Sequence, residues 1–340
     1  MFRSKSVAAR RFIFGAFLVW LACGTAVLAK SQLITPSVSW LASSVPDSAR
    51  IQVSKIVETD STAQMKFTTQ GSCAVKGKFL ATTKVGTCRI ELRLSATPKF
   101  AATTSVAIVR VKKKTELNVL AAASLANPFE TLGEIFTRRF MNVSVRFNFA
   151  GSATLAMQIQ QGAPVDIVAM ADTANMKKVL VSGDVERKSV ITLVRNQLAI
   201  LVQRGNPQKI NSLNDLARSG LKVVLCDLAQ PCGKYAATVL SKANVSFTVA
   251  SREASASGVV LRVGFGEADA GIAYITDGIV AGDKVDAVKI ADILNLIAEY
   301  PIGVATKPTT KDTAAIVAFM AMTKSSVGRT IFAENGFILP

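Results

Sequence analysis

The sequence predicts two folded parts, a small all-β sandwich followed by a larger α/β domain. Residues 31–114 alternate apolar and polar side chains at a period of two, which is typical of half-buried antiparallel strands. Between residues 115 and 340, short apolar runs alternate with helical patterns, as in a domain built on a mostly parallel sheet. At 340 residues and 50% hydrophobic composition, the chain is long enough to give each part its own core.

Residues 1–29 are typical of an export signal. Four basic side chains come first, at Arg3, Lys5, Arg10 and Arg11. An uncharged stretch of 18 residues follows at 12–29. Three outcomes remain open: cleavage after Ala29, retention as a membrane anchor, and lipidation at Cys23. A poor lipoprotein pattern around Cys23 favours the first two, and all three place the rest of the chain outside the cytoplasm.

The charge is concentrated at the front of the chain. Residues 1–114 carry 18 Lys and Arg against 4 Asp and Glu, within a net charge of +17 for the whole chain. Aromatic platforms and base-reading motifs do not accompany these cations, so we do not expect nucleic-acid binding. Because this part follows an export signal, we expect it to face anionic lipid or cell-surface polymer.

Cysteine usage also points to an oxidising compartment. Apart from Cys23, the cysteines form two local pairs, Cys73 with Cys88 and Cys226 with Cys232. Neither spacing suits a tetrahedral zinc site, and the chain contains no histidine. We therefore predict two disulfides. Without histidine a Ser/His/Asp triad is impossible, and we do not expect an enzyme.

Four strands are predicted in the first part, at residues 51–57, 63–67, 88–94 and 105–111. The pattern GSCAVKG followed by GTCRIELRL is similar to the immunoglobulin-like repeats of bacterial surface proteins. That resemblance implies a spacer or a wall-proximal module. Residues 112–114, three consecutive lysines, mark the boundary with the second part.

Two stretches organise the second part, residues 117–128 and 147–156. Each runs from a predicted strand through small residues into a helix, and each places a serine, Ser124 or Ser152, at the turn. Asn127 is a good N-cap type and Pro128 suits a first helical position. We expect the second helix at residues 154–161. Both serines then lie at helix N-termini on the carboxyl edge of a sheet, where free N–H groups favour an anion.

The same order of strand, small-residue turn and helix recurs further along. We predict strands at 223–227, 245–250 and 269–274, a helix at 235–242, and an amphipathic helix that begins with residues 255–262 and ends near residues 264–266. The last of these strands ends at Tyr274. Asp166 and Asp172 flank another buried strand at 165–170, and we expect both carboxylates to cap helices or pair, not to catalyse.

Three segments together resemble the extracytoplasmic molybdate-binding proteins of ABC importers. They are AAASL at 121–125, FAGSATLAMQIQQGAPVDIVAMAD at 149–172 and GEADAGIAY at 266–274. The resemblance covers residues 116–340 and implies a type II periplasmic-binding-protein fold. The apolar runs 197–203 and 300–306 would be the crossings between lobes. Lobe 1 would comprise 116–198 and 303–340, and lobe 2 would comprise 199–302.

The resemblance also implies the site. The family binds a tetrahedral dianion between its lobes through serine hydroxyls, backbone N–H groups and a tyrosine. The matching positions here are Ser124, Ser152, Cys232, Ala256 and Tyr274. Cys232 and Ala256 would act through backbone N–H groups, and the side chains of Ser124, Ser152 and Tyr274 would hold the molybdate oxygens. Lys234 stands near the site and departs from the neutral pattern.

We therefore expect a monomeric protein without a cofactor that captures molybdate or tungstate and delivers it to the permease of an ABC importer. One alternative is a binding protein for another tetrahedral oxyanion, such as sulfate. The other is a surface protein outside transport, with a degenerate receptor domain.

Overall fold

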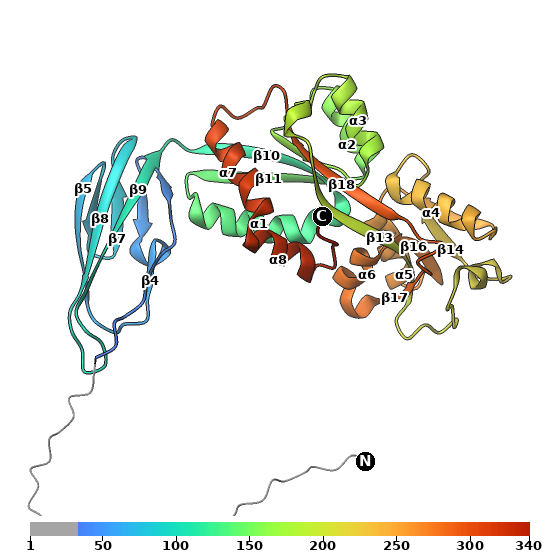
Figure 1. Ribbon diagram of the computed structural model, residues 1–340, viewed down its shortest axis with the longest axis horizontal. Coiled ribbons are helices and arrows are strands. Elements are labelled where there is room, and N and C mark those ends of the chain that lie inside the picture. Colours follow the sequence, from blue (N-terminus) through green and yellow to red (C-terminus); the bar gives the residue numbers. More distant parts are fainter. Residues whose placement is uncertain (1–32) are drawn as a thin grey trace, which may run out of the picture.

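The computed structural model describes residues 33–340, so the predicted export signal at 1–29 lies outside the described residues. These residues form a β-rich part followed by a larger α/β part (Figure 1). Within residues 33–340, no helix is both long and apolar enough to cross a membrane.

Residues 33–112 form short strands in three small sheets. The strands are β1 (Val38–Trp40), β2 (Ser44–Pro46), β3 (Arg50–Gln52), β4 (Val57–Thr59), β5 (Met65–Gly71), β6 (Cys73–Lys76), β7 (Phe79–Thr82), β8 (Gly86–Leu94) and β9 (Thr103–Lys112). One sheet has the order β2-β9-β8-β5, the second β3-β7-β6, and β1 pairs with β4. Buried side chains from the two larger sheets, including Leu80 and Ile90, share one core.

The prediction of a single strand at residues 51–57 is wrong. A 3-10 turn, Val53–Lys55, divides it because the chain leaves one sheet and joins another. Ile51 pairs with Leu80 of β7, whereas Val57 pairs with Trp40 of β1. The predicted disulfide Cys73–Cys88 is confirmed, with 5.5 Å between the Cα atoms. It connects β6 to β8 and so joins the two larger sheets.

The β-rich part is joined to the α/β part by hydrogen bonds and an ion pair in addition to the covalent connection. The backbone N–H of Ser43 donates to the carbonyl of Arg139 at 2.8 Å, and that of Met141 donates to the carbonyl of Ser44 at 2.9 Å. The ammonium of Lys112, at the end of β9, lies 3.3 Å from the carboxylate of Asp312.

Lobe 1 is a parallel sheet core with helices on both faces. Its strands are β10 (Thr115–Ala122), β11 (Val143–Ala150) and β12 (Ile167–Ala169), with β10 in the middle, and the antiparallel β18 (Ile297–Val304) beside β12. One face is covered by α1 (Ala126–Arg139), α7 (Thr313–Lys324) and α8 (Ser326–Glu334), which pack through Phe129, Phe136 and Phe319. The other face is covered by α2 (Ser152–Gln160) and α3 (Thr173–Val181) (Figure 1).

Lobe 2 repeats this arrangement around a second group of strands. These are β14 (Val223–Cys226), β15 (Val249–Glu253), β16 (Ala270–Tyr274) and β17 (Val285–Lys289). The helices are α4 (Pro231–Lys242), α5 (Ala256–Gly264) and α6 (Ile275–Ala281). Within the sheet β14 is parallel to both β15 and β16.

One long strand, β13 (Ile191–Gln203), belongs to both lobes. Residues 191–197 pair with β18 in lobe 1, and residues 198–203 pair with β16 and β17 in lobe 2. The return crossing lies beside it, where the side chain of Asn295 accepts from the N–H of Leu198 at 3.3 Å and donates to its carbonyl at 2.9 Å. The structure thus places the return before β18 and not within the predicted run at 300–306, because β18 already pairs with strands of lobe 1.

Several predicted boundaries are corrected where small residues precede a helix. α2 begins at Ser152, not at residue 154, and α4 begins at Pro231, not at residue 235. Around Ser124 a 3-10 turn, Ala123–Leu125, leads directly into α1, so Asn127 and Pro128 lie inside the first turn and Asn127 is not the cap. The strand predicted at 245–250 is shifted to Val249–Glu253. The corrected starts of α2 and α4, Ser152 and Pro231, both line the cavity between the lobes.

Candidate functional site

The two lobes enclose a small cavity of about 20 Å³ where four helical starts converge. The starts belong to the 3-10 turn before α1 and to α2, α4 and α5, and each follows the carboxyl end of a strand. All five predicted site residues line the cavity: Ser124, Ser152, Cys232, Ala256 and Tyr274. The other lining residues are small or uncharged, namely Ala122, Ala123, Ala150, Gly151, Ala171, Gln230, Pro231 and Ser255. Convergent helix starts make this a place suited to an anion.

Ser152 is the first residue of α2, and its side chain is only 1% exposed. Its hydroxyl oxygen accepts a hydrogen bond of 2.9 Å from the backbone N–H of Ala171. A backbone N–H can only donate, so the hydroxyl proton of Ser152 is left to be donated elsewhere. This residue therefore offers a hydroxyl donor to the cavity that it lines.

Ser124 is oriented by a chain of three polar side chains. Its hydroxyl lies 3.0 Å from the hydroxyl of Tyr300, which in turn lies 3.3 Å from the amide nitrogen of Asn196. The carbonyl oxygen of the Asn196 side chain accepts from the N–H of Gln197, so its amide nitrogen faces Tyr300 and the hydroxyl of Thr276. That nitrogen can only donate, so the Tyr300 hydroxyl accepts from it and keeps its own proton to donate. Either hydroxyl of the Ser124–Tyr300 pair can be the donor, and when Tyr300 donates, the proton of Ser124 is available to a ligand.

Tyr274, the last residue of β16, is 2% exposed. Among residues 33–340 its hydroxyl oxygen has no hydrogen-bond partner. Burial raises the pKa of the phenol well above its ordinary value, so the group is a neutral donor at physiological pH. A buried hydroxyl without a partner costs roughly 1–3 kcal/mol, and such a group suits a ligand that accepts hydrogen bonds.

Backbone donors complete the set. The first N–H groups of a helix have no acceptor within that helix. In α5 the N–H of Gly258 is capped by the Ser255 hydroxyl at 3.2 Å. For the N–H groups of Cys232 and Ala256, near the starts of α4 and α5, the described part of the chain provides no hydrogen-bond acceptor. They are available to an anion.

The predicted disulfide Cys226–Cys232 is confirmed, with 5.7 Å between the Cα atoms. It ties the end of β14 to the first turn of α4. Cys232 therefore has no free thiol, and its available contribution to the cavity is the backbone N–H. The bridge also fixes the position of that N–H relative to the sheet.

The cavity wall carries no charged side chain among its lining residues. Lys234 is exposed and does not line the cavity. Burial raises the pKa of the nearby Asp172 carboxyl, and the positive charge of Lys234 opposes this with a smaller lowering effect.

The expected structural roles of the two aspartates are confirmed. Asp172 caps α3 by accepting from the N–H of Asn175 at 2.7 Å, and Asp166 accepts from the N–H of Asn118 at 2.7 Å.

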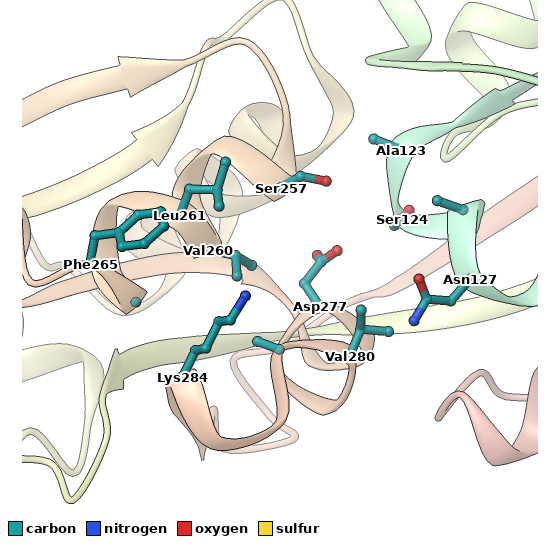
Figure 2. A pocket seen from close by; sticks show the side chains of 13 residues that line it. Ala123, Ser124, Asn127, Ser257, Val260, Leu261, Phe265, Asp277, Val280 and Lys284 are labelled. Atoms are coloured by element: carbon teal, nitrogen blue, oxygen red, sulfur yellow. The ribbon is translucent and has the colours of Figure 1, made fainter.

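A larger groove of about 250 Å³ adjoins the cavity, and Ser124 lines both (Figure 2). In this view Ser124 and Asn127 of lobe 1 face Asp277, Val280 and Lys284 of lobe 2. The carboxylate of Asp277 accepts from the N–H of Tyr274 at 3.0 Å, and burial raises its pKa to about 7. The groove therefore has a carboxyl group that titrates near neutral pH beside the cavity.

Four residues around the site escaped the sequence analysis: Asn196, Gln230, Asp277 and Tyr300. Asn196 lies directly before one predicted crossing run and Tyr300 begins the other. The apolar pattern that identifies these runs does not indicate a role for a polar side chain. Gln230 stands directly before the proline that opens α4, a cap position that could have been recognised. Asp277 is the third residue of α6, a position that favours an acidic side chain near an N-terminus.

Relatives of this chain include two that are named as molybdate-binding proteins. "Molybdate-binding protein ModA" of Mycobacterium tuberculosis is 36% identical over 222 residues, a match that covers 65% of this chain and 84% of the relative. "Molybdate-binding protein ModA" of Escherichia coli is 29% identical over 234 residues, covering 66% and 89%.

The fold also matches solved structures. The periplasmic molybdate-binding protein of Azotobacter vinelandii superposes with a TM-score of 0.59 at 20% identity, over 66% of this chain and 99% of that protein. The sulfate-binding protein SubI of Mycobacterium tuberculosis superposes with a TM-score of 0.57 at 19% identity, over 66% and 86%. Residues 117–338 match the family described as bacterial extracellular solute-binding protein. The chain belongs to this family of bacterial extracellular solute-binding proteins.

Proposed function

We propose that this protein captures molybdate or tungstate in the cavity between its lobes and delivers it to the permease of an ABC importer. The residues that would hold the oxyanion are Ser124, Ser152, Cys232, Ala256 and Tyr274. The observation that carries the proposal is the composition of the cavity, which offers hydroxyl and N–H donors from both lobes and no charged side chain. The relatives of Mycobacterium tuberculosis and Escherichia coli, both molybdate-binding proteins, support this ligand.

The polarity of the donors supports a fully ionised oxyanion. The hydroxyl of Ser152 already accepts from the N–H of Ala171, so it would donate its own proton inward. The hydroxyl of Ser124 would do the same when the hydroxyl of Tyr300 donates to it. A hydrogen bond to a charged group contributes roughly 1.5–3 kcal/mol net, about twice a neutral one. Four helical starts add their positive dipole ends. A cation would find no oppositely charged side chain among the lining residues of this cavity.

Sulfate is the alternative ligand, because it has the same charge and shape. The similarity to SubI shows the fold alone and does not favour sulfate over molybdate. Selection of molybdate over sulfate would depend on the size of the ion, since the smaller sulfate cannot reach all hydrogen-bond donors of a rigid cavity at once. Tungstate, which is nearly the size of molybdate, would be accepted equally.

The family consists of solute-binding proteins, in line with the expectation that the chain is not an enzyme. The family also agrees with export to the periplasm or the cell surface. We propose in addition that the β-rich part is an immunoglobulin-like sandwich that acts as a spacer. Its basic surface would contact anionic polymer or lipid, and the protein would act as a monomer.

The test is a thermal-shift screen of the purified protein with molybdate, tungstate, sulfate, phosphate and chromate, followed by competitive titration calorimetry. Molybdate and tungstate should give the largest shifts and compete on near-equal terms. A larger shift with sulfate would assign the cleft to another oxyanion. If none of the anions changed the melting temperature, the result would support the alternative of a degenerate receptor domain outside transport.

A further inference from the structure

The side chain of Gln230 joins the two lobes directly. Gln230 precedes α4 in lobe 2, but its side chain does not cap that helix. Instead its amide oxygen accepts from the N–H of Ala153 in the first turn of α2, at 3.3 Å, and its amide nitrogen donates to the hydroxyl of Thr154, also at 3.3 Å. Both partners belong to lobe 1. The Gln230 side chain is buried, with the residue 6% exposed.

Gly151 provides the space for this contact. A Cβ atom added there would lie 2.7 Å from the amide nitrogen of Gln230 and closer still to its oxygen. The backbone of Gly151, with φ −64° and ψ 143°, has a conformation that any residue adopts. The absence of a side chain therefore matters for contact with Gln230 and not for the backbone itself.

We propose that Gln230 is an interlobe latch, a positioning residue that stabilises the closed cleft over the bound oxyanion. The inference rests on the proposed function and adds a determinant of closure to it. Both hydrogen bonds cross from one lobe to the other, so separating the lobes breaks them. The apparent affinity of a ligand that needs the closed form scales with the population of that form.

The chemistry of glutamine suits this role. Its amide satisfies one N–H at the start of α2 and one hydroxyl of the same turn without placing a charge on the cavity wall. A carboxylate at position 230 would accept from the same N–H but would repel a dianion. The latch therefore closes the lobes without competing electrostatically with the ligand.

The decisive experiment is a double-mutant cycle with Gln230→Ala and Gly151→Ala, read out by molybdate titration calorimetry and stopped-flow dissociation. Loss of two neutral hydrogen bonds should weaken molybdate binding roughly 5- to 150-fold, mainly through faster dissociation. Gly151→Ala should have a similar effect by displacing the amide. In the Gln230→Ala background Gly151→Ala should cost nothing more, because the clash has gone. Gln161→Ala, an exposed glutamine at the other end of α2, should leave affinity unchanged.

A second readout separates a latch from a direct ligand or a purely structural residue. In the anion-free protein, Gln230→Ala should speed hydrogen exchange at the amide of Ala153, measured by NMR, while strand amides in β10 and β16 keep their protection. Additive effects of the two substitutions, or unchanged exchange at Ala153, would overturn the latch. If no oxyanion bound the native protein, the proposed function would fail, yet Ala153 exchange would still decide whether Gln230 holds the lobes together.

Discussion

Replacing Tyr274 by phenylalanine should stabilise the empty protein and weaken anion binding at the same time. The phenol is buried at the end of β16, and its hydroxyl lacks a hydrogen-bond partner within residues 33–340. Removing that hydroxyl should raise the free energy of unfolding by roughly 1–3 kcal/mol, because the folded protein no longer has to bury an unpaired polar group. The ring itself, packed edge-on against Tyr300 with centroids 5.6 Å apart, remains.

The thermal midpoint of the anion-free protein should therefore rise. For a domain of this size, each kcal/mol corresponds to about 2–4 °C, which gives an increase of roughly 2–12 °C. Molybdate affinity should fall at the same time, because one hydrogen bond to a charged ligand, worth roughly 1.5–3 kcal/mol, is lost. This corresponds to a decrease of about 10- to 150-fold.

Scanning calorimetry without anion and titration calorimetry with molybdate measure the two effects separately. Tyr235→Phe is the matched control, since Tyr235 lies in α4 outside the cavity lining and should change neither quantity appreciably. A lower midpoint for the anion-free Tyr274→Phe protein would show that the hydroxyl is satisfied without ligand. An unchanged affinity would show that it does not reach the anion. Either result would refute the reasoning.

Three further predictions concern the donors, the groove and the division into domains. Ser152→Ala should lower molybdate affinity about ten- to a hundredfold by calorimetry, whereas Ser257→Ala, an exposed serine outside the cavity lining, should not. Affinity should fall as the pH rises through about 7, because ionised Asp277 repels the dianion despite Lys284 in the same groove, and Asp277→Asn should flatten this profile. The stability that neutral Asp277 contributes is complete below its ordinary pKa of 3.8 and is lost as the pH rises to about 7. A chain of residues 115–340 should bind molybdate within a few-fold of the longer protein, and a hundredfold loss would implicate the β-rich part.

Local pattern predicted the parts of the site that depend on local structure. The order of strand, small residues and helix around Ser124 and Ser152 was sufficient to predict that the two residues lie at the same edge of a sheet, and both line one cavity there. Cysteine spacing predicted both disulfides for the same reason, since each pair is close along the chain. The resemblance to a known family added Cys232, Ala256 and Tyr274.

Contacts between distant segments could not be predicted in this way. Asn196 and Tyr300 orient Ser124 from strands far along the chain, and no periodicity records which polar residue of a buried strand faces a neighbour. Helix starts were misplaced by a few residues because small residues and proline tolerate both the turn and the first helical position. The break in the strand predicted at 51–57 arises from pairing with two different sheets, which a single run of alternating residues does not encode.

The docking of the β-rich part has a mechanical consequence. The backbone hydrogen bonds of Ser43 and Ser44 and the ion pair of Lys112 all reach lobe 1, at the end of α1, at the turn after it and at the start of α7. Asp312 serves both as the partner of Lys112 and as the cap of α7, where it accepts from the N–H of Ala315. These contacts tie the β-rich part to lobe 1, and none of them reaches lobe 2. We therefore expect the β-rich part and lobe 1 to move as one body when the lobes separate, so that the β-rich part sets the direction in which the cleft faces.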